Sequence, residues 1–559
     1  MKRAWLLVSL VLAACAAPRS DAKLFHNGRI YLGHVHGGGA AWPSVEALLV
    51  RAGKVEAAGA LAELEPLAAG CERIDLRGGV AVPGLQDAHG HFEGLGAALE
   101  TVDLRGCASY AELVERVRAR AAELPAGTWI EGRGWDQNLW SPPEFPHHAE
   151  LSAALPEHPA ILQRVDGHAL LANAKAMQLA GVLAARASES FGEGGRVLLD
   201  RERRPTGIFV DDACELVQRA LPPPTRAVRE RRFLLAQSQL LSLGLTAIHD
   251  MGIDRDGIAI LRALYERGEL RIRAIEYVSG SGTLDAQSVR GLPWSTGADQ
   301  VLSVVGVKLY ADGALGSRGA ALLEPYHDDP THAGLALLDR DSLQSAVAVC
   351  ARAGLQPAVH AIGDRANRMV LDAYERQGQS ELNFRSLRPR VEHAQVVAPE
   401  DWERFEELGA IASMQPTHAT SDMPWAPARL GPERIAGAYA WRRLVHDPAR
   451  LAFGSDFPVE SPDPRLGLYA AVTCARPDGT PAGGFLPDQR LTPAEAFAAF
   501  TLGAARAARE DERRGLLLPG YAADLTVFAE DPFALAPERW LTLPVRATIV
   551  NGEPVFRAP

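Results

Sequence analysis

The chain has 559 residues, and because a domain takes roughly 100–200 residues, more than one folding unit is expected. Hydrophobic residues make up 47% and charged residues 23%, which is typical of globular proteins and excludes a disordered chain or a small disulfide-stapled domain. The net charge of -11 repels phosphate backbones, so nucleic acid is excluded as the main partner.

The N-terminus has the features of a bacterial export signal. Lys2 and Arg3 precede an apolar run, Ala4–Ala14, that is too short to span a bilayer. The tetrapeptide Leu-Ala-Ala-Cys that ends at Cys15 resembles a lipobox, which predicts a signal peptide over residues 1–14 and acylation of Cys15. The protein is then expected on the periplasmic face of the outer membrane, held only by its lipid anchor. The alternative is an ordinary cleaved signal peptide and a soluble periplasmic protein.

Five further cysteines follow, at positions 71, 107, 214, 350 and 474. They form no Cys-x-x-Cys pair and no spacing typical of a structural zinc site. We interpret them as buried unpaired thiols, although an exported protein can form disulfides.

Short strand-like runs occur near both ends of the chain, at residues 24–31 and 45–50 and again at 523–528 and 547–556. Each group is too short to bury a core alone. We therefore expect both ends to combine in one small β-sandwich domain, made of residues 15–78 and 515–559.

The body, residues 79–514, alternates strand-like and helical stretches, which is typical of a parallel sheet. Eight strand-like runs match the number that closes a (β/α)8 TIM barrel. The fold class is thus α/β. The expected strands are Val80–Leu85, Leu245–His249, Arg271–Val278, Val304–Leu309, Gln356–His360, Pro389–His393, Ala410–Met414 and Leu451–Phe453.

The gap between the first and second strands is too long for one helix, so residues 100–225 are expected to form an insertion. An insertion at the carboxyl end of a barrel strand would overhang the face where barrel enzymes do chemistry. We interpret it as a lid and specificity element. Trp135, Asp136 and His168 lie in it and are candidates for substrate binding, with structural packing of the lid as the alternative.

A His-x-His pair, His89 and His91, lies at the end of the first expected strand. Residues two apart in an extended segment point the same way, so both imidazoles can reach one metal ion. An isolated pair is weak evidence, because a hydrogen-bonding role explains it as well.

Four more residues suited to a metal centre each lie at or just past the end of a separate expected strand. They are Lys308, His360, His393 and Asp456. Taken singly, each buried histidine is more often an ordinary core residue, but four residues suited to a metal centre at the ends of four barrel strands argue against that alternative.

These motifs resemble the amidohydrolase superfamily, specifically amidohydrolase family 3, the branch of N-substituted formamide deformylase-like hydrolases. The resemblance covers nearly the whole mature chain. It rests on Pro-Gly-Leu-x-Asp-x-His-x-His at 83–91, Gly-Trp-Asp at 134–136, Asp-Gly-His at 166–168, Lys308 with the segment 312–318, His360 with Gly363-Asp364, Glu392-His393 and Gly-Ser-Asp at 454–456.

By position, the resemblance implies that His89 and His91 are the ligands of the first strand, His360 and His393 those of the fifth and sixth strands, and Asp456 that of the eighth. One or two divalent ions, zinc above all, would then lower the pKa of a bound water and polarise the scissile carbonyl. Asp456 is expected to be the general base.

Lys308 matches the lysine that carries a metal-bridging carbamate in the binuclear members of the superfamily. Carbamylation requires a neutral amine, which burial favours. The alternative is an unmodified lysine that holds substrate or an acidic neighbour.

The implied activity is hydrolysis of a non-peptide C–N bond in a small amide-type substrate: an N-acyl or N-formyl amide, a carbamate or a similar group. Arg318 is a candidate for bidentate binding of a substrate carboxylate, although a lone arginine is just as often a surface residue without such a role. The alternatives are a mononuclear deaminase or cyclic-amide hydrolase and, in another class, an envelope binding lipoprotein without turnover. A homodimer is an expectation by analogy with the fold class alone.

Overall fold

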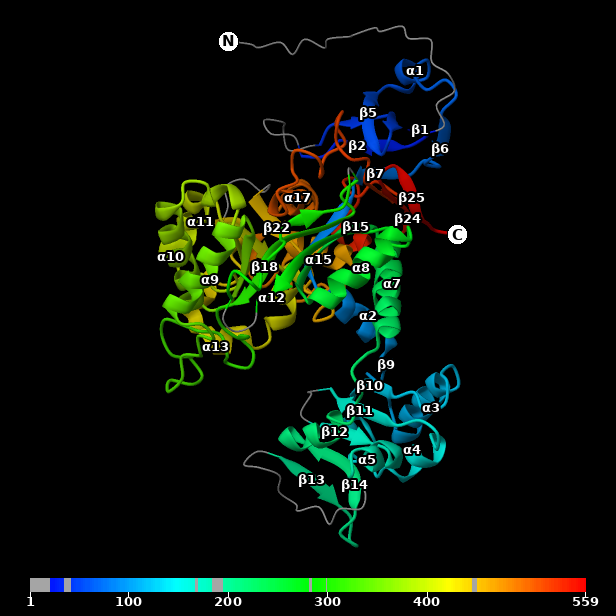
Figure 1. Ribbon diagram of the computed structural model, residues 1–559, viewed down its shortest axis with the longest axis vertical. Coiled ribbons are helices and arrows are strands. Elements are labelled where there is room, and N and C mark those ends of the chain that lie inside the picture. Colours follow the sequence, from blue (N-terminus) through cyan, green and yellow to red (C-terminus); the bar gives the residue numbers. More distant parts are fainter. Residues whose placement is uncertain are drawn as a thin grey trace. The chain divides into compact units, whose positions relative to one another are not determined.

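The computed structural model describes residues 21–34, 42–165, 169–182, 195–280, 284–297, 299–444 and 450–559. The chain divides into two compact units (Figure 1). The first contains the chain up to Phe92 and from Gln237 onward, and the second is Glu93–Ala236.

The first unit contains a parallel eight-stranded sheet, in the order β22-β21-β20-β19-β18-β16-β15-β8. A parallel bridge between Gly90 and Phe457 brings the two edge strands together, so the sheet nearly closes into a barrel. The predicted α/β TIM-barrel fold is confirmed. The strands are β8 (Leu85–Gly90), β15 (Leu245–Ile253), β16 (Arg273–Ser279), β18 (Leu302–Tyr310), β19 (Gln356–Ala361), β20 (Arg390–His393), β21 (Ile411–Met414) and β22 (Leu451–Phe453).

The bounds of the first predicted strand, Val80–Leu85, are wrong. Residues Val80–Pro83 form β7, which pairs with β2 (Arg29–Tyr31) and β23 (Leu525–Phe528) in another sheet, and the barrel begins only at Leu85. Gly84 lies between the two strands. A Cβ atom there would lie 2.3 Å from the hydroxyl oxygen of Thr246, so a residue with a side chain does not fit at this position. The short apolar run therefore serves two sheets rather than one.

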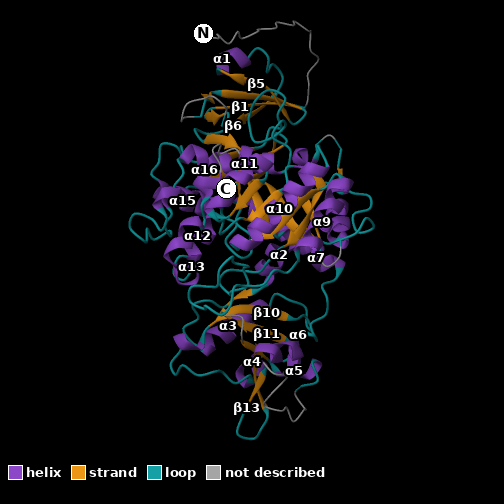
Figure 2. Cartoon of the chain, turned by 90° about the vertical axis from the view of Figure 1, so that its left-hand side faces the viewer, coloured by secondary structure: helices purple, strands orange, loops and turns teal. Residues whose placement is uncertain are grey.

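Helices follow the strands. They include α8 (Arg255–Glu266), α9 (Arg340–Ala353), α10 (Asp364–Ser380), α11 (Trp402–Leu408), α12 (Pro416–Asp422) and α15 (Pro464–Thr473). Three of them, α8, α9 and α15, begin with an aspartate side chain that caps a backbone N–H. At α9, the side chain of Asp339 accepts a hydrogen bond from the backbone N–H of Ser342, and Gly354 ends the helix in the left-handed region. Figure 2 shows such helices in purple around the orange strands of the barrel.

Both ends of the chain contribute to two further sheets of the first unit. One is β5-β4-β1-β6, and the other is β25-β24-β23-β7-β2-β3. Apolar residues of both sheets pack into one core, among them Phe25, Leu48, Leu525 and Ile549. The strands not yet given are β1 (Ala22–His26), β3 (Ser44–Val45), β4 (Ala47–Arg51), β5 (Lys54–Gly59), β6 (Glu72–Asp75), β24 (Val545–Val550) and β25 (Glu553–Arg557).

The second unit, which contains the predicted insertion of residues 100–225, folds around a sheet of its own in the order β13-β14-β12-β11-β10-β9. Trp135 is fully buried in its core and donates a hydrogen bond from Nε1 to the Leu162 carbonyl at 2.7 Å. The strands are β9 (Val102–Asp103), β10 (Ile130–Trp135), β11 (Ala160–Arg164), β12 (Ala169–Ala172), β13 (Arg196–Leu199) and β14 (Pro205–Val210), with α3 (Tyr110–Ala121), α4 (Ala149–Ala154), α5 (Ala174–Leu179) and α6 (Glu215–Gln218) beside them.

Among the described residues, the five cysteines from position 71 onward are free thiols, and four of them are buried. None of the described helices is both long enough and apolar enough to cross a bilayer.

Candidate metal centre

The structure brings the six predicted site residues together at the carboxyl ends of the barrel strands. His89 lies on β8, Lys308 on β18, His360 on β19 and His393 on β20. His91 follows β8 directly, and Asp456 follows β22 by three residues. All six line one cavity of about 390 Å³. Barrel enzymes place their reacting groups on this same face.

His89 is completely buried and is oriented by a carboxylate. Its Nδ1 lies 2.6 Å from Oε2 of Glu392, and Arg390 donates to the other oxygen of that carboxylate at 2.7 Å. Burial raises the pKa of Glu392, but Arg390 and His89 outweigh it and hold that pKa below its ordinary value, so Glu392 is an anion. Nδ1 of His89 therefore carries the proton, and Nε2 presents a lone pair to the cavity.

His393 is oriented in the same way by an amide. Its Nδ1 lies 2.9 Å from Oε1 of Gln415, which leaves Nε2 for the cavity. The backbone of His393 has a φ of 72° and that of Asp456 a φ of 60°, a region that residues other than glycine rarely adopt. Strained backbone at two ligand-type residues is typical of a functional site.

Asp456 lies between two groups of histidines. One of its oxygens, Oδ1, is 3.1 Å from Nε2 of His91 and 3.5 Å from Nε2 of His89. The other, Oδ2, is 3.7 Å from Nε2 of His418. Two donor sets that share Asp456 result, one with His89 and His91 and one with His393 and His418, and the donor atoms of each set lie within 4.8 Å of one another.

The donor atoms fit a divalent cation. Among the described residues, Nε2 of His360 and Nε2 of His418 are buried and have no hydrogen-bond partner. Burial, with a contribution from Lys308, lowers the pKa of His89 to about 4 and that of His360 to about 3, so both imidazoles are neutral and can donate a lone pair. Histidine nitrogens with a carboxylate oxygen are ligands that suit zinc.

Lys308 is buried beside these ligands, with its Nζ 3.3 Å from Nε2 of His89. Burial lowers its pKa to about 8, although Glu392 and Asp456 oppose the shift. About a tenth of the amine is therefore neutral at pH 7, far more than for an exposed lysine with its ordinary pKa of about 10.4.

His418 is a site residue that the sequence pattern did not reveal. It lies on α12, four residues beyond the end of β21, whereas the other ligand-type residues lie within three residues of their strands. Its position soon after a predicted barrel strand is the signal that would have found it. The same cavity is also lined by Tyr310, Asp422, Trp425 and Glu460, none of which had been singled out.

The predicted substrate-binding residues that the structure describes have other contacts. Arg318 donates to Asp328 at 3.0 Å and does not line the cavity. In the second unit, Trp135 is a core residue, and Asp136 caps a short helix and accepts a hydrogen bond from Arg164 at 2.8 Å. His168 and the predicted lipidation site Cys15 are not among the described residues.

Comparisons with known proteins agree with this geometry. A sequence profile described as "Amidohydrolase family" matches residues 72–556. The protein YtcJ of Bacillus subtilis (strain 168) is 30% identical over 540 residues, with 95% of this chain and 99% of YtcJ covered. N-substituted formamide deformylase of Arthrobacter pascens is 25% identical over 529 residues, covering 91% of this chain and 94% of that enzyme.

A solved structure extends the comparison to three dimensions. An uncharacterized metal-dependent hydrolase from Pyrococcus furiosus matches with a TM-score of 0.76 and 30% identity, over 92% of this chain and all of that chain. The profile covers most of the sequence, and the solved structure shares the fold over most of this chain. The chain therefore belongs to the amidohydrolase family.

Proposed function

We propose that this metal-dependent amidohydrolase cleaves a non-peptide C–N bond of a small amide-type substrate, an N-acyl or N-formyl amide or a carbamate. The single observation that carries the proposal is the pair of donor sets that share Asp456. The relationship to N-substituted formamide deformylase supports this bond type, because that relative is named for cleavage of such a bond.

The donor sets are expected to hold two divalent ions, with zinc as the first choice. The two sets would supply ligand atoms from His89, His91, His393, His418 and Asp456. His360 lines the same cavity, and its buried Nε2 is available as a further ligand. Ions held there would supply Lewis-acid polarisation of the scissile carbonyl and a water of lowered pKa.

The residues of the chain perform the proton transfer. Burial raises the pKa of Asp456, but His89, His91 and the other facing histidines outweigh it and lower that pKa well below its ordinary value. Asp456 is thus an anion that can take a proton from the attacking water and pass it to the leaving amine. Burial raises the pKa of Tyr310, so its phenol stays protonated in the same cavity and can donate to a substrate oxygen.

Lys308 is proposed to carry a carbamate, whose oxygens would add ligand atoms for the ions. The support is its burial, its lowered pKa and its approach to His89. An unmodified lysine would instead stay positively charged beside the ligands and weaken cation binding.

Metal content tests the proposal most directly. We expect about two zinc equivalents per chain by elemental analysis after growth or reconstitution with zinc and bicarbonate. Lys308→Ala should lower this number, and bicarbonate should no longer increase it. One equivalent that persists without Lys308 would support a mononuclear mechanism. No bound metal after reconstitution would contradict the proposed hydrolase activity.

We also propose that the protein is exported and anchored through Cys15, on the sequence of its first 15 residues alone. Labelling with a palmitate analogue in a bacterial host should mark the wild type and not Cys15→Ser. A labelled variant, or an unlabelled wild type, would contradict the anchor.

A further inference from the structure

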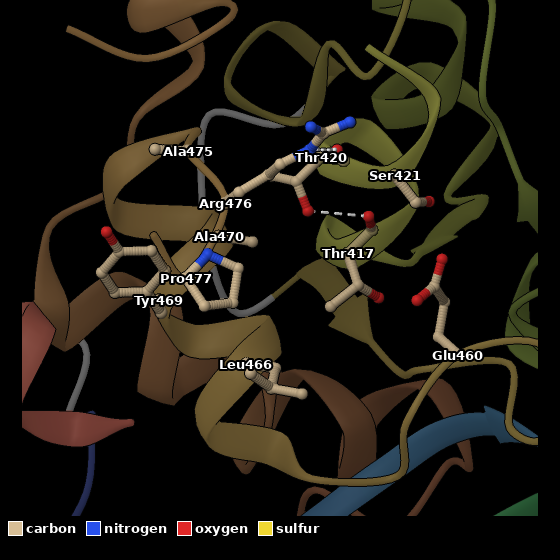
Figure 3. A pocket seen from close by; sticks show the side chains of 10 residues that line it. All are labelled: Thr417, Thr420, Ser421, Glu460, Leu466, Tyr469, Ala470, Ala475, Arg476 and Pro477. Carbon is tan, nitrogen blue, oxygen red and sulfur yellow. Dashed lines mark hydrogen bonds between the residues drawn. The ribbon is translucent and has the colours of Figure 1, made fainter. Parts of the chain in front are cut away.

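Figure 3 shows the residues that line a second cavity, of about 230 Å³. It shares Ser421 and Glu460 with the lining of the larger cavity, so the two cavities meet at these residues. Everything that lines it belongs to the first unit. We call it the side pocket.

The helix α12 forms the partition between the two cavities. Thr417, Thr420 and Ser421 line the side pocket, while His418, Ser421 and Asp422 line the metal cavity. Both sets have the spacing i, i+3, i+4 that places residues on one helix face. The two sets are offset by one residue and share Ser421, so a single short helix supplies a ligand-type histidine on one face and a wall of the side pocket on the adjacent face.

The opposite wall is apolar. Leu466, Tyr469 and Ala470 of α15 line it with the same helical spacing, and Pro477 closes it. Figure 3 shows these side chains across the pocket from Thr417 and Glu460. An engineered apolar cavity of about 150 Å³ binds benzene, so this volume has room for a group at least that large.

Arg476 does not make the pocket a site for anions. Its Nε donates to the Thr420 carbonyl at 3.3 Å, which holds the charged head against the backbone of α12. In Figure 3 the guanidinium lies beside Thr420, away from Leu466 and Tyr469, so the stem rather than the charge covers the pocket. Glu460, where the cavities meet, would repel a carboxylate that approaches from the metal centre.

One polar group in the side pocket has no partner. Thr417 is 8% exposed, and its hydroxyl oxygen forms no hydrogen bond with any residue that the structure describes. Burying a hydroxyl without a partner is unfavourable, so such a group points to a ligand or an ordered water.

We propose that the side pocket is a substrate subsite that takes an uncharged, largely apolar substituent of the amide, of about the size of a phenyl ring. The hydroxyl of Thr417 is available to a single polar atom on that substituent. This assignment rests on the proposed function, because it names the part of the substrate that lies beside the reacting bond.

Binding of N-benzylacetamide to metal-free protein, followed by ligand-observed NMR, tests the subsite without turnover. Ala470→Leu fills the pocket from α15 and should weaken binding about tenfold or more, as expected when a hydrophobic pocket loses room for its group. The matched control is Ala482→Leu, which makes the same change at an exposed position that does not line the pocket. Equal affinity of the wild type and Ala470→Leu would overturn the proposal.

A second variant covers the case in which Ala470→Leu does not fold. Leu466→Ala enlarges the pocket, so it should shift the preference from N-benzylacetamide toward its naphthylmethyl analogue. An unchanged preference would contradict the subsite.

Two further outcomes separate the alternatives. Tighter binding of N-acetylphenylalanine than of N-benzylacetamide, abolished by Arg476→Met, would replace the apolar assignment with carboxylate recognition. Binding of N-benzylacetamide that depends on Ala470, without hydrolysis by zinc-loaded enzyme of this or any other amide, would leave the subsite standing and contradict the proposed function instead.

Discussion

His89 and Glu392 are 303 residues apart in the sequence, yet Nδ1 of His89 lies 2.6 Å from Oε2 of Glu392. Arg390 holds the same carboxylate from β20 and also donates to the Ala88 carbonyl at 2.6 Å, next to His89 on β8. This buried chain of contacts ties two barrel strands together and fixes the side of the imidazole that faces the cavity. Such partners of a ligating histidine set its tautomer and its basicity.

Glu392→Gln should therefore weaken metal binding, although it leaves every residue that would bind the ion unchanged. An amide cannot hold the Nδ1 proton of His89 as strongly as a carboxylate, so affinity should fall by about 10–100-fold. Competition with a chromophoric zinc chelator measures the change, at a temperature where near-ultraviolet circular dichroism shows a folded protein.

Ser413→Ala is the matched control for this experiment. Ser413 also accepts a hydrogen bond from Arg390, at 2.9 Å, but does not touch His89. Its zinc affinity should stay within about twofold of the wild type. If both variants lose affinity equally, the effect comes from disturbing Arg390 rather than from the contact between Glu392 and His89.

Sequence patterns predicted the barrel because its eight strands are buried apolar runs. Each expected run lies mostly within a barrel strand except the first, which shares only Leu85 with β8. That exception has a long-range cause. The run from Val80 to Leu85 reads as one strand, but β7 pairs on one side with β23, more than 400 positions away, where Thr526 lies opposite Val82. No local pattern reports a partner at that distance.

The ligand-type residues at strand ends were predictable for the same reason, since parallel strands bring their carboxyl ends together. His418 and Glu460 were not, because they lie on helix and loop segments whose course depends on packing. For Arg318 the residue type alone suggested binding of a substrate carboxylate. The structure shows instead that its guanidinium donates hydrogen bonds to Asp328.

His418→Ala should remove one donor set and leave the other. The variant is expected to hold about one zinc equivalent where the wild type holds about two, because His89, His91 and Asp456 remain. Elemental analysis after gel filtration measures this. His332→Ala, at an exposed position outside both donor sets, is the control and should keep the wild-type content. Two equivalents in His418→Ala would assign the second set to other residues.

Arg318→Ala should change kcat/KM for an amide substrate by less than about threefold, because this side chain does not line the cavity. Its ion pair with Asp328 is partly exposed, and such pairs contribute little to stability. Tyr310→Phe is the informative comparison, since it removes a hydroxyl from the cavity itself and should lower kcat. A large loss in Arg318→Ala alone would restore the hypothesis that Arg318 binds a substrate carboxylate.

Asp524 links the barrel to the sheets built from the chain ends through a buried ion pair. It precedes β23, and both of its oxygens accept hydrogen bonds from Arg273 of β16, at 2.6 and 2.8 Å. Arg273 is completely buried, so Asp524→Asn leaves a buried cation without its counter-ion. Removing one partner of such a pair typically costs about 3–5 kcal/mol in the free energy of unfolding, which urea denaturation at pH 7 would measure.

The same pair predicts how this difference depends on pH. Burial raises the pKa of Asp524, but Arg273 outweighs it, and the pKa in the folded protein lies below that in the unfolded chain, which is about 3.9. The carboxylate therefore contributes its full stabilisation above about pH 5 and loses it as the pH falls below about 4 and the folded protein takes up the proton. The difference in the free energy of unfolding between the wild type and Asp524→Asn should be constant from pH 8 to 5 and should become smaller at lower pH. A difference that grows on acidification would show that Asp524 is protonated in the folded protein at neutral pH and does not pair with Arg273 as an anion.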